Sequence, residues 1–144
     1  ELGQVGGSGI QTVVGEYGTK RIYVPYEKIN PLIVRGIVAT EDIRYFEHPG
    51  IDWRGIVRAA RENAKVGRIV QGGSTLPQQL VKNLLEKRAK TSGRKATEAL
   101  LARELTKKFS KEKILEIYLN HIFFGNNTYG VEAAAQFYFG RSQA

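Results

Sequence analysis

The spacing of apolar residues predicts a mainly α protein. From residue 30 onward, apolar residues recur every three or four positions, which is typical of helices with one face in a core. Helix-capping residues precede several of these stretches, as Asn30, Asp52 and Ser110 do. We therefore expect helices over about residues 30–45, 52–67, 74 onward, 94–108, 110–124 and 131–140.

The first 29 residues lack this helical spacing. They are rich in glycine, and the short apolar runs "IQTVV" and "RIYVPY" favour a hairpin or an extended arm. The sequence thus predicts two parts, an N-terminal arm or hairpin over residues 1–29 and a helical core over residues 30–144.

The stretch "GGSTLPQQLVKN" predicts a helix with an unusual polar face. At about 100° per residue, its polar side chains form two adjacent rows, which are Ser74, Gln78 and Lys82, and Thr75, Gln79 and Asn83. A solvated helix face usually carries more charge than one lysine in six positions. Hydroxyls and amides suit a ligand rich in hydroxyl and phosphate oxygens. They also suit a buried polar seam, and the pattern leaves both interpretations open.

Two glutamates lie on apolar stripes. Glu41 extends the stripe of the first predicted helix, and Glu98 shares a face with leucines of the fourth. A carboxylate at the margin of a core is partly desolvated, which suits acid–base chemistry near neutral pH. The alternative is an ion pair, of Glu98 with Arg94, or of Glu41 with His48 or a lysine. For His48, beside a turn, we favour a hydrogen bond to the loop backbone.

The amino-acid composition limits the classes of binding partner and of chemistry. The 144 residues carry 22 Lys and Arg against 14 Asp and Glu, a net charge of +8, which favours an anionic partner. Cysteine is absent, which excludes disulfides and thiolate chemistry, and two histidines make a zinc site improbable. No apolar run is long enough to span a membrane.

The second predicted helix carries a basic ridge, composed of Arg54, Arg58, Arg61, Lys65 and Arg68. It suits anionic headgroups, at about 1 kcal/mol per residue close to the surface, or it is a solvated outer face. Nucleic-acid binding would favour exposed aromatic residues among the cations. Most aromatic residues lie instead on apolar stripes, for example Tyr118, Phe123, Phe137 and Phe139, so we expect no nucleic-acid partner.

Five motifs in order resemble those of the peptidoglycan glycosyltransferase (transglycosylase, family 51) domain. This family includes class A penicillin-binding proteins and monofunctional peptidoglycan glycosyltransferases. The matching stretches are "EDIRYFEHPGID", "GGSTLPQQLVKN", "RKATE", "KEKILEIYLN" and "GVEAAAQFYFG", and they cover roughly residues 20–140.

The resemblance implies a lysozyme-like α fold and an inverting enzyme that polymerises lipid II into β-1,4 glycan strands, releasing undecaprenyl pyrophosphate. It places the enzyme on the outer, periplasmic face of the bacterial cytoplasmic membrane, with lipid II, a lipid-linked glycan strand and an anionic membrane surface as partners. It also implies that a Mg²⁺ or Mn²⁺ ion can accompany the substrate pyrophosphate, with no metal held by the protein alone.

The resemblance also assigns roles by position. Glu41 corresponds to the general base and Glu98 to the second essential glutamate. The substrate-binding positions that it implies are Asp42, Phe46, His48, Gly73, Ser74, Thr75, Gln78, Gln79, Lys82, Asn83, Lys90, Arg94 and Lys95. Among these, Lys82, Arg94 and Lys95 correspond to cations around the donor pyrophosphate.

The sequence departs from the family pattern in three respects. Lys90 stands where an arginine is usual, and Pro77 replaces a usual threonine. The chain also ends soon after "YFG", so we expect a core truncated at its C-terminus, without a membrane anchor, and a parent protein that can carry a transpeptidase domain. Two rival functions remain, a lysozyme-type glycosidase and a non-catalytic basic module that binds membranes or anions.

Overall fold

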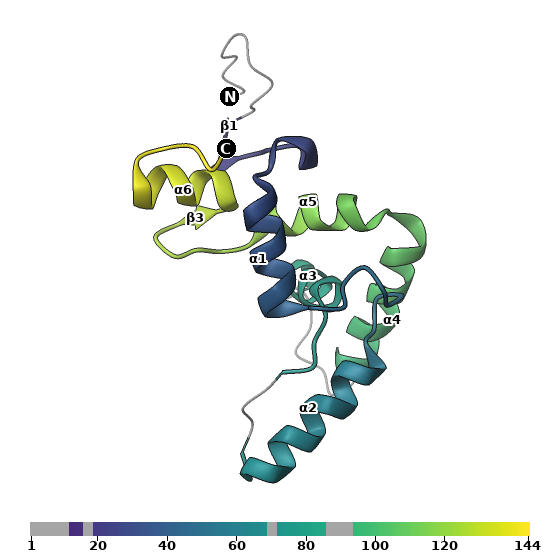
Figure 1. Ribbon diagram of the computed structural model, residues 1–144. Helices are drawn as coiled ribbons and strands as arrows, with labels where there is room; N and C mark the ends of the chain where they lie inside the picture. The colour runs from purple at the N-terminus through teal and green to yellow at the C-terminus, as the bar shows by residue number, and fades with distance from the viewer. Residues whose placement is uncertain (1–11, 16–18, 69–71, 86–93) are drawn as a thin grey trace. The chain divides into compact units, whose positions relative to one another are not determined.

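A computed structural model describes residues 12–15, 19–68, 72–85 and 94–144 (Figure 1). Two strands and a short 3-10 helix come first: β1 (Thr12–Gly15), β2 (Thr19–Ile22) and η1 (Tyr26–Lys28). The other described elements are α1 (Pro31–Glu41), α2 (Trp53–Val66), α3 (Leu76–Leu85), α4 (Arg94–Lys108), α5 (Lys111–His121), β3 (Thr128–Tyr129) and α6 (Val131–Phe139). The predicted mainly α, lysozyme-like class is confirmed. No helix in these ranges is long and apolar enough to cross a membrane.

Two of the predicted capping residues, Asn30 and Ser110, make the expected hydrogen bond. Asn30 Oδ1 accepts a hydrogen bond from the Leu32 amide at 3.0 Å, and Ser110 Oγ accepts one from the Lys113 amide at 3.1 Å. Gly67 ends α2 with a φ of 68°, a left-handed conformation that favours glycine.

Helix α1 is shorter than predicted, because it ends at Glu41 and not near Tyr45. Beyond Glu41 the backbone changes to turns, in which amides bond to carbonyls three residues back. The Tyr45 amide donates to Asp42 O at 2.8 Å, and the Glu47 amide donates to Arg44 O at 2.9 Å. These bonds replace the helical pattern, which the apolar spacing alone does not reveal.

The chain divides into two compact units, residues 1–34 with 115–144 and residues 35–114. The predicted boundary between residues 29 and 30 stays a prediction. In the first unit, β1 pairs antiparallel with β2, as the predicted hairpin requires, and β2 pairs parallel with β3. The sequence did not predict β3, whose two residues, Thr128 and Tyr129, face Lys20 and Arg21.

Side-chain hydrogen bonds fix the segment after β2 in the first unit. Asn120 on α5 accepts from the Val24 amide and donates to the Val24 carbonyl, both at 2.8 Å. Glu116, one turn earlier, accepts a hydrogen bond from the Tyr23 hydroxyl and, at 3.0 Å, one from the Tyr26 amide. Two polar residues of "KEKILEIYLN", Glu116 and Asn120, therefore hold the segment that precedes α1.

The second unit contains α2, α3 and α4, and α3 packs against α4. Its core consists of side chains with at most 1% of their surface exposed, namely Tyr45, Leu76, Leu80, Ala102 and Ile114. The Tyr45 hydroxyl donates to the Lys111 carbonyl at 2.7 Å, so the aromatic ring is both packed and hydrogen-bonded. This core holds the residues of the candidate site.

Candidate active site

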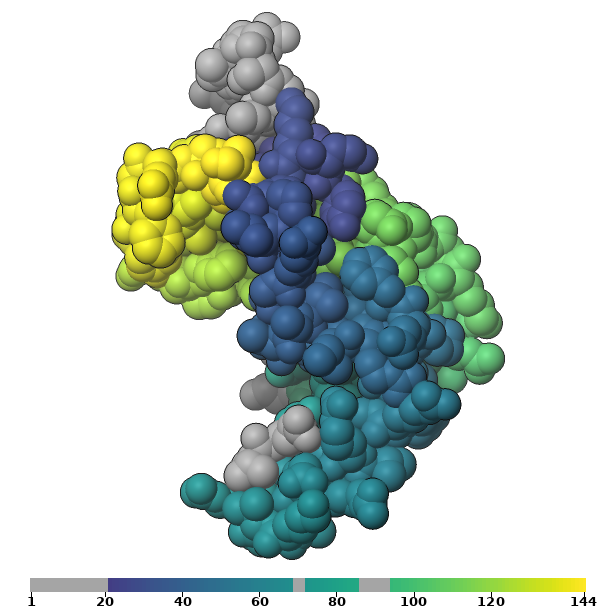
Figure 2. Space-filling model, viewed as in Figure 1, coloured from purple at the N-terminus to yellow at the C-terminus, as the bar shows by residue number. Residues whose placement is uncertain are grey.

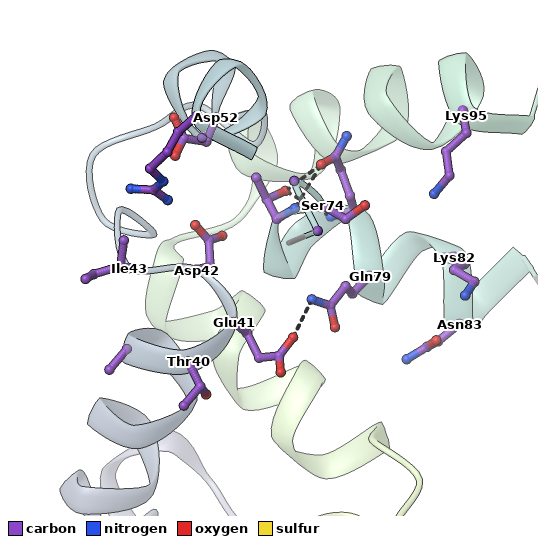
Figure 3. A pocket seen from close by; sticks show the side chains of 17 residues that line it. Thr40, Glu41, Asp42, Ile43, Asp52, Ser74, Gln79, Lys82, Asn83 and Lys95 are labelled. Atoms are coloured by element: carbon purple, nitrogen blue, oxygen red, sulfur yellow. Dashed lines mark hydrogen bonds between the residues drawn. The ribbon is translucent and has the colours of Figure 1, made fainter. Parts of the chain in front are cut away.

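A cleft of about 740 Å³ lies within the second unit (Figure 3). Ten of the predicted site residues line it: Glu41, Asp42, Gly73, Ser74, Thr75, Gln78, Gln79, Lys82, Asn83 and Lys95. The structure thus brings together residues of three of the quoted motifs, which lie up to 54 positions apart between Glu41 and Lys95 (95 − 41).

Glu41 is the last residue of α1, and it is exposed in the cleft. The predicted partial burial of this carboxylate is wrong, because Glu41, at the C-terminal end of α1, is exposed. Gln79 on α3 donates from Nε2 to Glu41 Oε2 at 2.9 Å, and Figure 3 shows the two side chains pointing toward one another. The partner is a neutral amide, and not the histidine or lysine that the ion-pair interpretation requires.

The first turn of α3 is capped by its own side chains. Thr75 Oγ1 accepts from the Gln78 amide at 3.3 Å, and Gln78 Oε1 accepts from the Thr75 amide at 2.9 Å, which is a capping box. Asp42 Oδ2 accepts from the Leu76 amide at 2.9 Å, and Pro77 has no N–H to offer. These amides are occupied, so an anion cannot be held at this helix N-terminus without breaking those bonds.

The buried-seam interpretation of the polar face of α3 is therefore right for part of it, and the ligand interpretation stays a prediction for the rest. Thr75 is 2% exposed, and its hydroxyl also donates to the Gly50 carbonyl at 2.6 Å, so this position belongs to a buried seam. Gln79 and Asn83 lie on the cleft side, as does Lys82 (Figure 3).

Glu98 is buried, with 1% of its surface exposed, and it is held by two cations. Lys95 Nζ lies 2.8 Å from Glu98 Oε2, and Arg94 Nε lies 3.2 Å from Glu98 Oε1. The ion-pair interpretation is thus right for the pair Glu98–Arg94, and Lys95 joins it. Glu98 does not line the cleft, but Lys95 does, so the lysine links the buried carboxylate to the cleft.

Asp42 and His48 form a buried pair. His48 Nε2 lies 2.8 Å from Asp42 Oδ1 and 2.9 Å from Oδ2, and both side chains are 3% exposed. His48 Nδ1 accepts from the Gly50 amide at 3.1 Å, which confirms the predicted loop hydrogen bond. Phe46 is 54% exposed and packs edge-on against Tyr45, and it does not line the cleft.

Two predicted positions remain, Gly73 and Lys90. Gly73 packs close to α2, where a Cβ atom would lie 3.3 Å from Ile56 Cα. Lys90 lies outside the described residues. The substrate-binding roles of all these positions stay predictions.

Sequence reasoning missed three polar residues of the lining, Thr40, Asp52 and Arg58. Arg58 was placed on the basic ridge, and only the tertiary structure shows that its side of α2 borders the cleft. Asp52 occupies the N-cap position of α2, but its carboxylate makes no capping hydrogen bond. It lies 3.4 Å from Arg44 Nη1 instead. A hydrogen bond to Glu47 and the charge of Asp52 raise the pKa of Arg44, so this guanidinium stays charged.

The described residues contain no group of three or more His, Cys, Asp or Glu side chains that could hold a metal ion. A Mg²⁺ or Mn²⁺ ion therefore stays a prediction tied to the substrate pyrophosphate.

The sequence matches the family model described as "Transglycosylase" over residues 7–144. It is 54% identical over 129 residues to penicillin-binding protein 1A of Aquifex aeolicus, covering 87% of this chain and 18% of that protein. It is 49% identical over 117 residues to the biosynthetic peptidoglycan transglycosylase of Chromobacterium violaceum, covering 81% of this chain and 51% of that protein. It is 42% identical over 135 residues to penicillin-binding protein 4 of Bacillus subtilis, covering 94% and 22% respectively. The chain thus spans about half of the length of one of these relatives and about a fifth of the other two.

Proposed function

The chain belongs to the transglycosylase family, and from this premise we propose that it is a peptidoglycan glycosyltransferase. The proposed reaction polymerises lipid II into β-1,4-linked glycan strands and releases undecaprenyl pyrophosphate, with inversion at the sugar. The observation that supports it is one cleft that holds an exposed carboxylate, Glu41, together with the cations Arg58, Lys82 and Lys95.

Glu41 acts as the general base. Its exposed carboxylate becomes desolvated when substrate fills the cleft. It then takes the proton of the acceptor sugar's 4-hydroxyl as that oxygen attacks C1 of the donor sugar. Gln79 holds Oε2 at 2.9 Å and so orients the carboxylate for this proton transfer.

The cations stabilise the negative charge of the leaving group. A lipid pyrophosphate departs as a stable anion, which requires fixed positive charge and no proton from the enzyme. The first-turn amides of α3 are already bonded within the protein, so this charge comes from side chains, Lys82 on α3 and Lys95 on α4. A Mg²⁺ or Mn²⁺ ion carried by the pyrophosphate would share this work. Unchanged turnover in EDTA would assign it to the side chains alone.

The cleft favours transfer over hydrolysis. A glycosidase must protonate a departing sugar oxygen with a carboxylic acid beside it. Besides Glu41, the carboxylates of the described lining are Asp42 and Asp52. Asp42 accepts hydrogen bonds from His48 and the Leu76 amide, and Asp52 faces Arg44, so both carboxylates are already engaged by groups of the protein.

The face of α2 that carries the ridge suits an anionic membrane surface. Trp53 and Val57 are 69% and 60% exposed, one turn apart, and they line a groove together with one acidic residue, Glu62, and four basic ones, Arg54, Arg58, Arg61 and Lys65. Tryptophan beside lysine and arginine is typical of membrane interfaces. The α2 segment, coloured teal, presents its side chains at the surface in Figure 2. We place this surface on the outer face of the bacterial cytoplasmic membrane, in a longer parent protein that can carry a transpeptidase domain.

The test is the reaction with two substrates. The chain should convert labelled lipid II to glycan polymer and free undecaprenyl pyrophosphate, and it should leave lipid-free peptidoglycan unchanged. Release of muropeptides from lipid-free strands, without polymer from lipid II, would establish a hydrolase instead. Binding to anionic vesicles with neither reaction would establish a non-catalytic basic module.

A further inference from the structure

We infer that Asp42 and His48 are positioning residues, which anchor the first turn of α3 and so hold Gln79 against Glu41. This role rests on the proposed function, because Glu41 is the base of the proposed reaction. It differs from the substrate contact that the family resemblance implies for both residues, and the two roles predict different kinetics.

The hydrogen bonds around His48 fix its tautomer. The Gly50 amide can only donate, so Nδ1, at 3.1 Å from it, must be the unprotonated nitrogen. Nε2 therefore carries the hydrogen and donates it to Asp42. Counted over the whole residue, His48 is 5% exposed and Asp42 is 7% exposed. His48 therefore cannot reach the cleft to act on a substrate without breaking these bonds.

Asp42 connects His48 to α3. Its Oδ2 accepts a hydrogen bond from the Leu76 amide at 2.9 Å, across 34 positions of sequence. A carboxylate at a helix N-terminus is stabilised by the helix dipole and by the charge-assisted hydrogen bond. Because the carboxylate is buried and held from the other side by His48, it fixes where α3 begins.

The contacts form a closed ring that contains the proposed base. Glu41 and Asp42 are consecutive residues; Asp42 binds the amide of Leu76, and Gln79, three positions further along α3, binds Glu41. A shift of the first turn of α3 would therefore move the Gln79 amide relative to the Glu41 carboxylate.

Further contacts fix the loop that carries His48. Gly50 has a φ of +100°, and a Cβ atom there would lie 2.7 Å from Ala102 O, so only glycine fits. Thr75 Oγ1 donates to Gly50 O at 2.6 Å, and Lys111 Nζ donates to His48 O at 2.5 Å. His48 consequently has a rigid support from which to hold Asp42.

The main test is Asp42→Asn, which keeps the size but turns one acceptor oxygen into a donor that faces N–H groups. A misplaced base should lower turnover about 10- to 100-fold, with the KM for lipid II and the binding of undecaprenyl pyrophosphate unchanged. Glu104→Gln is the matched control, because this exposed carboxylate in the same unit bonds only to a neighbour on its own helix, at 2.6 Å from Lys107. A raised KM with unchanged turnover would show substrate contact and overturn the role.

A double-mutant cycle separates positioning from general loosening. If Asp42 acts through Glu41, then Asp42→Asn should have little further effect in the Glu41→Gln background. If the double variant instead loses turnover by the product of the two single-variant factors, the positioning role of Asp42 is contradicted. His48→Gln, which keeps a donor toward Asp42, should retain more turnover than His48→Leu, and equal losses would also contradict it.

Amide hydrogen exchange tests the anchor without any activity. The Leu76 amide should exchange faster in Asp42→Asn than in the wild type and Glu104→Gln. Unchanged protection of this amide would refute the anchor. If the wild type forms no polymer from lipid II, the proposed function fails, while the exchange measurement still decides the anchor.

Discussion

Thr75→Val is the substitution that best tests how the polar face of α3 works. It removes one hydroxyl from a side chain that is 2% exposed, and it keeps the shape and volume of threonine. The hydroxyl donates to Gly50 O at 2.6 Å and accepts from the Gln78 amide at 3.3 Å. The family resemblance assigns Thr75 to the substrate, whereas these contacts predict an effect on stability.

The magnitude follows from the two bonds. Loss of a threonine N-cap costs about 1 kcal/mol, and a buried carbonyl left without a donor costs about 1–3 kcal/mol. We therefore expect the free energy of unfolding to fall by about 2–4 kcal/mol. For a chain of this size, each kcal/mol shifts Tm by roughly 4 °C, so Tm should fall by roughly 8–16 °C.

The assay is thermal unfolding followed by circular dichroism, with two further variants. Thr75→Ser keeps the hydroxyl and should lose less stability than Thr75→Val. Thr40→Val is the matched control, because Thr40 is exposed and its hydroxyl bonds only to carbonyls of its own helix, Gly36 O at 2.8 Å and Ile37 O at 3.3 Å. The reasoning is refuted if Thr75→Val is as stable as Thr40→Val.

Three other predictions concern the base, the cations and a half-buried lysine. Glu41→Gln keeps size but removes the basic oxygen, so polymerisation of lipid II should fall at least about 100-fold with an unchanged melting curve; near-native turnover would disprove the assignment. Lys82→Met should weaken binding of undecaprenyl pyrophosphate, measured by titration calorimetry, and equal binding would count against a role in holding the leaving group. Burial lowers the pKa of Lys111 below its ordinary 10.5, although the charge of Asp42 opposes this. As pH rises from that lowered pKa toward 10.5, the folded protein binds fewer protons than the unfolded chain, so the wild type should gain stability relative to Lys111→Met; a relative loss over this range would contradict the direction.

Local features of the structure were predictable from the sequence. The helix periodicity, the Ser110 cap and the left-handed Gly67 depend on neighbouring residues only, and the structure has each of them. The range of α4 was also predicted, as Arg94–Lys108. These features follow from backbone geometry, which one stretch of sequence determines.

Long-range pairings were not predictable from one sequence. Asn120 holds Val24 across 96 positions, and β3 joins β2 at Lys20 and Thr128. The sequence suggested Arg94 as the partner of Glu98, and His48 or a lysine as the partner of Glu41. Only the fold decides that His48 binds Asp42 and that Gln79 binds Glu41. Side chains of similar hydrogen-bonding capacity cannot be matched until their distances are known.

The end of α1 explains why two consecutive carboxylates have opposite environments. Successive residues on a helix differ by about 100° in direction, so a continued helix would leave Glu41 and Asp42 on adjacent faces of one element. Helix α1 ends at Glu41, and a turn begins at Asp42, whose carbonyl accepts a hydrogen bond from the Tyr45 amide at 2.8 Å. Glu41 is exposed in the cleft, whereas Asp42 is buried, with 7% of its surface exposed. The exposed carboxylate keeps access to substrate, while the buried one can bond to α3 without competition from water. In the proposed reaction, the base must both take a proton and stay in place, and two residues serve these needs: the short backbone link between Glu41 and Asp42 transmits the position of α3 to Glu41.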